Sequence, residues 1–203
     1  MSNSAPAFRD LRFEDLETLK PRERILKTAI TLFNRYGVNT IGIDQIIEES
    51  NVSKRTFYNY YPSKNDLILS YLEFWDEFRF DNLAKHLASL KVHDPQTEIL
   101  TVFDALKDWI GQNDFHGCTF TRGLSDFTSE DTSLLLDKVN LHFKKAADFI
   151  GERLAQMVKP AKAKALLLEL LSLIVGAMVV AHATGDKSIA TLNKAIARSL
   201  LEA

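Results

Sequence analysis

The sequence predicts an all-α protein of about nine helices. Helix-breaking residues are scarce, with 8 glycines and 5 prolines among 203 residues, and residues with high helix propensity are abundant. Apolar residues recur at spacings of three and four along most of the chain, which is the period of a helix with one buried face. No segment reads convincingly as a strand, so helices account for the whole predicted fold.

The composition is typical of a globular protein. Cys118 is the only cysteine, so no intrachain disulfide can form, and a cytoplasmic location is expected,. No signal peptide is recognisable near the N-terminus,. The longest apolar run, Leu166–Ala183, is interrupted by Glu169, Ser172 and His182. We therefore interpret it as a buried or interface helix and expect no membrane association.

Helix-start and helix-stop residues divide the chain into segments. Residues 1–19 are expected to form a flexible tail, followed by a helix that opens on Pro21 and ends at Gly37,. Two short helices over about 43–50 and 54–61 and a long one over about 64–90 come next. The remaining helices are expected over about 96–111, 118–127, 129–158, 161–184 and 187–202,.

The two short helices and the three-residue turn between them have the spacing of a helix-turn-helix. Apolar residues provide its packing, namely Ile43, Ile46, Ile47, Val52, Phe57 and Tyr61. The remaining positions of the second short helix and the start of the next helix carry hydrogen-bond donors, namely Lys54, Arg55, Thr56, Tyr58, Asn59, Tyr60 and Lys64. Basic groups neutralise phosphates, and Arg, Asn and Thr can contact base edges, so these seven residues are predicted to bind DNA. A solvated polar face is the alternative.

The charge distribution agrees with this interpretation, although it carries less weight. Residues 20–64 hold eight Lys and Arg against four Asp and Glu, whereas residues 65–203 hold 15 against 19. A basic module ahead of an acidic body is typical of a small DNA-binding domain joined to another domain. Chance fluctuation over a short window would produce the same imbalance.

Residues 37–43, Ile46, the continuous stretch from Val52 to Lys64, and Leu67 closely resemble the N-terminal domain of the tetracycline-repressor (TetR) family. The resemblance covers about Pro21 to Tyr71. It implies an all-helical homodimer with a DNA-binding domain, here residues 20–66, and a ligand-binding and dimerisation domain, here residues 67–203. It also implies that Thr56, Tyr58, Tyr60 and Lys64 anchor phosphates, while Lys54, Arg55 and Asn59 lie toward base edges. The sequence departs from the family pattern at Gly42, where Ser or Thr is usual, and at Asn51, where Gly is common.

The C-terminal part has a less specific pattern. Residues 115–120 resemble the Gly-Cys segment that precedes the sixth helix in many members of the family. An apolar pocket with a few polar groups is expected for an unknown small-molecule ligand. The candidate lining residues are Trp75, Phe78, Trp109, His116, Cys118, Phe120, Arg122 and His142. For each of these, a place in the core or on the surface is the alternative, and Cys118 is expected to be a buried structural thiol rather than a redox sensor.

The last two helices are predicted to form a four-helix bundle across a homodimer. Their apolar stripes include Leu168, Leu171, Val175, Val179, Leu192 and Ile196. A dimer would also supply the two recognition helices that a palindromic operator requires. The alternative is that these stripes only close the core of one chain.

No catalytic or metal-binding pattern is recognisable. The five histidines have no metal-ligand spacing, and the sequence has no glycine-rich phosphate loop,. We therefore expect no enzyme activity, no cofactor and no metal. The predicted function is a ligand-responsive repressor that binds a palindromic DNA duplex, with activation still open. The alternative is a helical interaction protein that binds protein partners and uses DNA as a nonspecific anchor.

Overall fold

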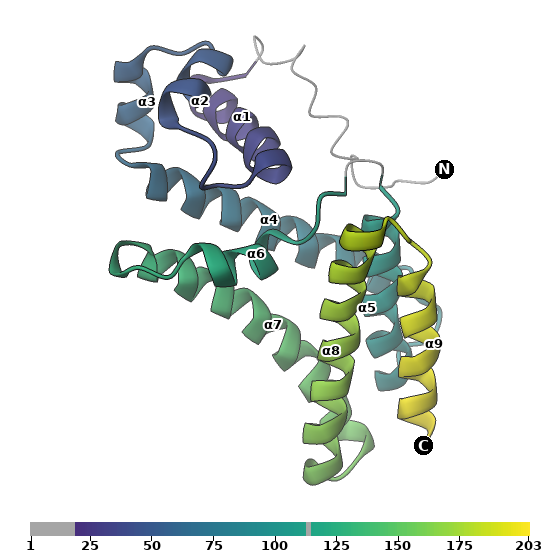
Figure 1. Cartoon of the computed structure of the whole chain (residues 1–203). Coiled ribbons are helices and arrows are strands. Elements are labelled where there is room, and N and C mark those ends of the chain that lie inside the picture. The colour runs from purple at the N-terminus through teal and green to yellow at the C-terminus, as the bar shows by residue number, and fades with distance from the viewer. Residues whose placement is uncertain (1–18, 113–114) are drawn as a thin grey trace. The chain divides into compact units, whose positions relative to one another are not determined.

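The computed structural model describes residues 19–112 and 115–203 (Figure 1). The tail expected over residues 1–19 lies outside the described residues, apart from its last position. Nine α-helices and one short 3-10 helix, with no strand, make up the regular structure of the described ranges, which confirms the all-α prediction. The helices are α1 (Pro21–Tyr36), α2 (Ile43–Glu49), α3 (Lys54–Tyr60), α4 (Lys64–Ala88), α5 (Pro95–Ile110), α6 (Thr119–Asp126), the 3-10 helix η3 (Glu130–Thr132), α7 (Ser133–Met157), α8 (Pro160–Thr184) and α9 (Ile189–Glu202).

Local capping explains where several helices begin and end. Prolines in the first turn open α1, α5 and α8, where a missing N–H leaves no intrahelical bond unmade,. Before α5, the Asp94 carboxylate accepts hydrogen bonds from the Thr97 N–H at 2.9 Å and the Thr97 hydroxyl at 2.6 Å. These bonds hold the pKa of Asp94 below its ordinary value,. Gly37 and Gly185 end α1 and α8 with positive φ angles of 87° and 73°, which L side chains rarely adopt,.

Contacts within the chain divide it into two compact units. The first unit comprises the described residues up to Asp76 together with Thr119–Val139, and the second comprises Glu77–Cys118 and Asn140–Ala203. The helices α4 and α7 each contribute residues to both units. A functional boundary near residue 66 stays a prediction, because contact density does not report which residues bind DNA.

The core of the first unit joins the helix-turn-helix to α1 and to the start of α4. The residues at its centre have no exposed surface, namely Ile25, Ala29, Phe33, Ile46, Phe57, Leu67 and Tyr71. The rings of Phe33 and Tyr71 meet edge to face with centroids 5.4 Å apart, which ties α1 to α4,. Short helices such as α2 and α3 are marginal alone, so this core holds them in place.

Side chains of α6 bond to the end of α1 within the same unit. The Arg122 guanidinium donates to the main-chain oxygen of Asn34 at 3.2 Å. The Asn39 amide donates to the carboxylate of Asp126 at 3.2 Å. These two bonds connect segments almost ninety positions apart in the sequence.

The second unit is built on α5, α8 and α9, which pack against one another. The buried Asn193 amide of α9 donates to the main-chain oxygen of Leu173 in α8 at 2.7 Å. The ammonium of Lys194 pairs with the carboxylate of Asp104 in α5 at 2.6 Å. A buried amide costs free energy unless it is bonded, so the Asn193 contact selects this alignment of α8 and α9.

One described helix, α8, is long and apolar enough to cross a membrane by length and composition. Its most apolar 18-residue window has a mean hydropathy of 2.2, and 28% of that window is buried. This is weak support for a span, because core helices of globular proteins pass the same test. The low buried share does mean that α8 presents many apolar side chains outside the core of its own chain.

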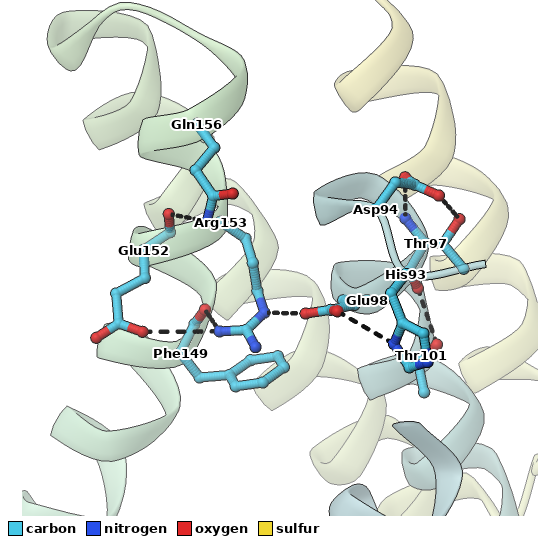
Figure 2. Close-up of polar contacts among 9 residues, drawn as sticks. All are labelled: His93, Asp94, Thr97, Glu98, Thr101, Phe149, Glu152, Arg153 and Gln156. Carbon is cyan, nitrogen blue, oxygen red and sulfur yellow. Dashed lines mark hydrogen bonds and ion pairs between the residues drawn. The ribbon is translucent and has the colours of Figure 1, made fainter. Parts of the chain in front are cut away.

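A network of charged side chains joins α5 to α7 in the second unit (Figure 2). The Arg153 guanidinium donates to the Glu98 carboxylate at 2.8 Å and to the main-chain oxygen of Phe149 at 2.9 Å, and it lies over the Phe149 ring. The His93 ring contacts the other oxygen of Glu98 at 3.5 Å. The side chains of Glu98 and Arg153 are each only 20% exposed, so solvent screens their attraction weakly,.

We expect Glu98→Gln to lower the free energy of unfolding by about 1–3 kcal/mol, since it removes the nearer and more buried of the two carboxylates that contact the Arg153 guanidinium and leaves only the exposed Glu152 at 3.7 Å,. Urea denaturation followed by circular dichroism measures this change. The matched control is Asp148→Asn, which breaks an exposed pair with Lys144 on the same helix and should change stability by at most about 0.5 kcal/mol,. Equal effects of the two substitutions would contradict the assignment.

Candidate nucleic-acid interface and ligand cavity

The turn between α2 and α3 directs the recognition helix. Asn51 has a φ of 51° and is the one described non-glycine residue with positive φ, as expected for the family glycine it replaces,. The Ser53 hydroxyl then caps α3 by accepting the Thr56 N–H at 3.0 Å,. Before α2, Gly42 provides no side-chain cap, as its lack of a side chain requires. The turn is therefore intact despite both departures from the family pattern.

The helix α3 separates a scaffold side from a donor side. The Phe57 ring has no exposed surface, whereas the side chains of Lys54, Arg55, Tyr58, Asn59 and Tyr60 are exposed. Tyr58 and Tyr60 are 42% and 44% exposed, which is high for aromatic residues,. In water these tyrosine rings leave apolar surface exposed. A bound polyanion would cover the rings and accept hydrogen bonds from their hydroxyls.

Some of these donors are held in position by neighbouring groups. The Thr56 hydroxyl lies 2.8 Å from the Ser53 hydroxyl. The Tyr58 ring meets Phe57 edge to face with centroids 5.3 Å apart. Both contacts reduce the conformational entropy that binding would otherwise cost.

Lys64 lies in the ordered first turn of α4. Ser63 and Asp66 cap this turn reciprocally, with the Ser63 N–H donating to the Asp66 carboxylate at 2.9 Å and the Asp66 N–H donating to the Ser63 hydroxyl at 3.2 Å,. Partial burial lowers the pKa of Lys64, because it removes water from the ammonium,. A phosphate at this helix N-terminus would offset that lost hydration.

An acidic residue lies beside the donor side. The Lys54 ammonium donates to the Asp44 carboxylate of α2 at 3.1 Å, and both side chains are well exposed. This hydrogen bond is the main reason that the pKa of Lys54 is raised. If Lys54 contacts DNA as predicted, Asp44 would compete with the DNA for its ammonium.

We expect Asp44→Asn to strengthen binding to nonspecific duplex and to steepen its salt dependence, because on a duplex without the operator bases the released Lys54 can neutralise a phosphate instead of contacting a base edge. The slope of log K against log salt should become more negative by up to about 0.9 per protomer. Fluorescence anisotropy with a scrambled duplex across a salt series measures it. Glu49→Gln, which removes a carboxylate bonded to Gln45 in α2, is the control, and an equal change in both variants would contradict the role of the pair.

A cavity of about 120 Å³ lies within the second unit. Its polar lining residues are Arg79, Asn82, Cys118 and His142. Its apolar lining residues are Phe80, Leu83, Val102, Ala105, Leu106, Trp109, Ala146, Ile174 and Met178. The helices α4, α5, α7 and α8 supply all of these except Cys118, which directly precedes α6.

Three of the eight residues predicted to contact a ligand line this cavity, namely Trp109, Cys118 and His142. Trp75 and Phe120 are buried in the first unit, and Arg122 bonds to Asn34 there. Phe78 and His116 belong to the second unit and are not among the lining residues. Cys118 is a buried thiol. Among the described residues, no group of three or more His, Cys, Asp or Glu is placed to hold a metal.

Sequence reasoning missed Arg79, Phe80 and Asn82 on α4. The dense aromatic residues of that helix indicated an apolar surface. No local pattern distinguished the residues that line the cavity from those that are buried in the core. The sequence signal that could have indicated a binding site on this helix was Arg79 next to Phe80, a cation beside an aromatic residue.

Residues 25–71 match the family model described as "Bacterial regulatory proteins, tetR family". This range contains α2, the turn, α3 and the start of α4, which carry the candidate interface residues described above.

Two curated regulators align with this chain. The uncharacterized HTH-type transcriptional regulator YuxN of Bacillus subtilis is 30% identical over 114 residues, which are 55% of this chain and 38% of that protein. The HTH-type transcriptional regulator LuxR of Vibrio harveyi is 26% identical over 98 residues, which are 48% of this chain and 47% of that protein. The aligned segments thus span less than half the length of each relative.

Solved structures match over nearly the whole chain. SCO4454, a TetR-family transcriptional regulator from Streptomyces coelicolor, has a TM-score of 0.81 and 25% identity, covering 90% of this chain and 94% of that one. A TetR transcriptional regulator from Chloroflexus aurantiacus has a TM-score of 0.77 and 18% identity, covering 93% and 96%. The second likeness concerns the fold alone.

Proposed function

We propose that this chain, which belongs to the TetR family of bacterial transcription regulators, binds a palindromic DNA operator as a homodimer and releases it when a small molecule fills the cavity of the second unit. It would act as a cytoplasmic repressor. DNA binding is assigned to residues 20–66, and ligand binding with dimerisation to residues 67–203.

The observation that carries this proposal is the donor side of α3. Five exposed polar or amphipathic side chains project from a helix that Phe57 anchors in the core. A second helix in a helix-turn-helix enters the major groove, where base edges present a distinct pattern for each base pair. Arg55 and Asn59 have the side chains that read guanine and adenine.

The phosphate contacts are assigned to residues whose side chains end in a hydroxyl or an ammonium. Thr56, Tyr58, Tyr60 and Lys64 carry hydroxyls or an ammonium, which bond to phosphates without reading sequence. Lys54, Arg55 and Asn59 are assigned to base edges.

The homodimer is assigned to α8 and α9. Leu168, Val179, Leu192 and Ile196 are 60%, 53%, 57% and 41% exposed, and Leu171 and Val175 are half-buried. Large apolar residues gathered on two neighbouring helices are typical of an interface. Packing against a second copy would cover them and would place two α3 helices on one duplex.

The release step is assigned to α6. Cys118 lines the cavity and is followed directly by α6, whose Arg122 bonds to the end of α1 at Asn34. A ligand that shifts Cys118 would therefore act on α6, which follows Cys118 directly in the chain, and on α1 through the hydrogen bond from Arg122. Such a ligand regulates DNA binding only if its affinity differs between the conformation that binds the operator and the conformation that releases it.

Selection from random DNA duplexes tests the proposal. Enrichment of an inverted repeat supports an operator-binding dimer. No enrichment, together with binding that disappears at moderate salt, would instead favour an interaction protein that uses DNA as a nonspecific anchor. A reporter gene with the enriched repeat overlapping its promoter then distinguishes repression from activation.

A further inference from the structure

The start of α1, which lies outside the helix-turn-helix, carries an excess of positive charge. Residues 19–27 hold four Lys and Arg against one Glu. That acid, Glu23, is engaged in capping, because its carboxylate accepts the Lys20 N–H at 3.0 Å,. The neighbouring Arg22 is exposed. It is not among the seven residues that the sequence predicts to bind DNA.

The guanidinium of Arg22 lies beside the end of the recognition helix. Its carbon centre is 6.0 Å from the centroid of the Tyr61 ring, at the residue where α3 ends. Burial raises the pKa of Tyr61, and the positive charge of Arg22 opposes that rise, so the cation also acts on the ring hydroxyl,. In the chain, Tyr61 lies between Tyr60 and Lys64, which are both proposed phosphate contacts. Arg22 is therefore next to the segment that would hold the DNA backbone.

The contact with Tyr61 leaves most of the binding capacity of Arg22 unused. A distance of 6.0 Å is at the outer limit of a cation–π interaction, and such a contact is weak at an exposed position,. The guanidinium has five N–H donors, more than one tyrosine hydroxyl can accept. Within residues 19–112 and 115–203 it forms no ion pair with a carboxylate. The side chain can therefore bind an anion without giving up another charge.

A duplex bound through α3 would bring phosphates to this cation. B-DNA carries one negative charge per about 1.7 Å of helix axis, so a cation beside one occupied phosphate contact meets a neighbouring phosphate. A guanidinium matches two phosphate oxygens with two parallel N–H donors. The ring of Tyr61 limits the freedom of the Arg22 side chain before DNA binds, which lowers the entropy that the contact would cost,.

We propose that Arg22 is an additional phosphate contact, so that the DNA-binding surface extends from α3 and the start of α4 to α1. The proposal rests on DNA binding through α3, which belongs to the proposed function, but it requires neither a palindromic operator nor a ligand. Phosphate contacts carry no sequence information. Arg22 therefore contributes to the affinity for every duplex alike.

Fluorescence anisotropy of the full chain with a scrambled duplex, across a salt series, tests the contact. Arg22→Met keeps an unbranched side chain beside Tyr61 and removes the charge. The slope of log K against log salt should become less steep by about 1.8 per dimer, or about 0.9 for each lost contact, and affinity at low salt should fall by about tenfold. Arg22→Lys keeps the charge and should keep the slope.

Arg35→Met is the matched control. Arg35 is an exposed arginine of the same helix, and its guanidinium likewise lies over a tyrosine ring, that of Tyr36 at 5.1 Å. Its replacement should leave the slope unchanged. A folded Arg22→Met protein with the wild-type slope would overturn the proposal, and so would equal changes of slope in the two methionine variants. Circular dichroism establishes folding.

Phosphate ethylation interference on an enriched operator distinguishes a direct contact from an effect that passes through Tyr61 to Lys64. A direct contact predicts one phosphate in each half-site whose ethylation weakens binding of the wild-type protein but not of Arg22→Met. That phosphate should differ from the one that ceases to matter in Lys64→Ala. If both variants lose the same phosphate and no other, Arg22 acts only through Lys64 and the proposal is wrong.

This inference and the proposed function fail separately. A reduced slope in Arg22→Met without any enriched duplex would support the contact and remove the operator. An enriched inverted repeat with an unchanged slope would remove the contact and leave the operator standing. A wild-type chain that binds no duplex at low salt would contradict both.

Discussion

Replacing Arg55 by alanine is expected to weaken operator binding by about 30-fold to 10⁴-fold and to relax the choice of base at one position in each half-site. A bidentate contact to guanine contributes about 1–3 kcal/mol of discrimination, and a dimer loses two of them. Arg55 is exposed on α3, and its side chain forms no part of the buried core. The loss should therefore appear in DNA affinity, while thermal stability should change by at most about 0.5 kcal/mol.

Lys64→Ala is the informative comparison for Arg55→Ala. A lost phosphate contact weakens binding to every sequence alike, and two lost contacts per dimer should make the salt slope less steep by about 1.8. Anisotropy titrations with the selected operator and with its single-base variants, each over a salt series, separate the two effects. Lys91→Ala, at an exposed position of the second unit outside α8 and α9, is the matched control. If Arg55→Ala weakens all duplexes equally, Arg55 binds phosphate and the assignment to base edges is wrong.

The helical framework was largely predictable from the sequence because its signals are local. Prolines and glycines mark helix ends whatever the rest of the chain does, so α1, α5 and α8 begin at or within one residue of their predicted starts,. The positive φ of Asn51 was predictable for the same reason, since few residues other than Gly and Asn adopt it,. The burial of Ile46 and Phe57 followed from helical spacing,.

Contacts between helices were not predictable in this way. Trp75 and Arg79 lie one turn apart on the same face of α4,, yet they belong to different units and only Arg79 lines the cavity. Helical spacing alone could not distinguish the two positions. Arg122 was a candidate ligand contact, with a place in the core or on the surface as the alternative, and its guanidinium reaches a main-chain oxygen 88 positions earlier. The Lys54–Asp44 pair likewise depends on the angle between α2 and α3, which only the folded turn determines.

The exposed apolar side chains of α8 and α9 allow the dimer assignment to be tested apart from folding. Leu192 is 57% exposed, so it contributes little to the core of its own chain. If a second copy covers it, Leu192→Arg would bury an unpaired charge on each side of a symmetric interface, and each buried charge costs several kcal/mol. The dimer dissociation constant should then rise by about 10³-fold or more, because every 1.4 kcal/mol is a factor of ten.

Sedimentation velocity should therefore find Leu192→Arg monomeric at concentrations where the wild-type chain is dimeric, while circular dichroism finds the same helix content in both proteins. Operator affinity should fall by about 10²-fold to 10⁴-fold, because a monomer loses the effective concentration that links two half-sites. Val92→Arg is the matched control, since Val92 is 63% exposed and lies outside α8 and α9. If Leu192→Arg instead unfolds the chain while Val92→Arg does not, the stripe closes the core of one protomer, and the dimer must form elsewhere.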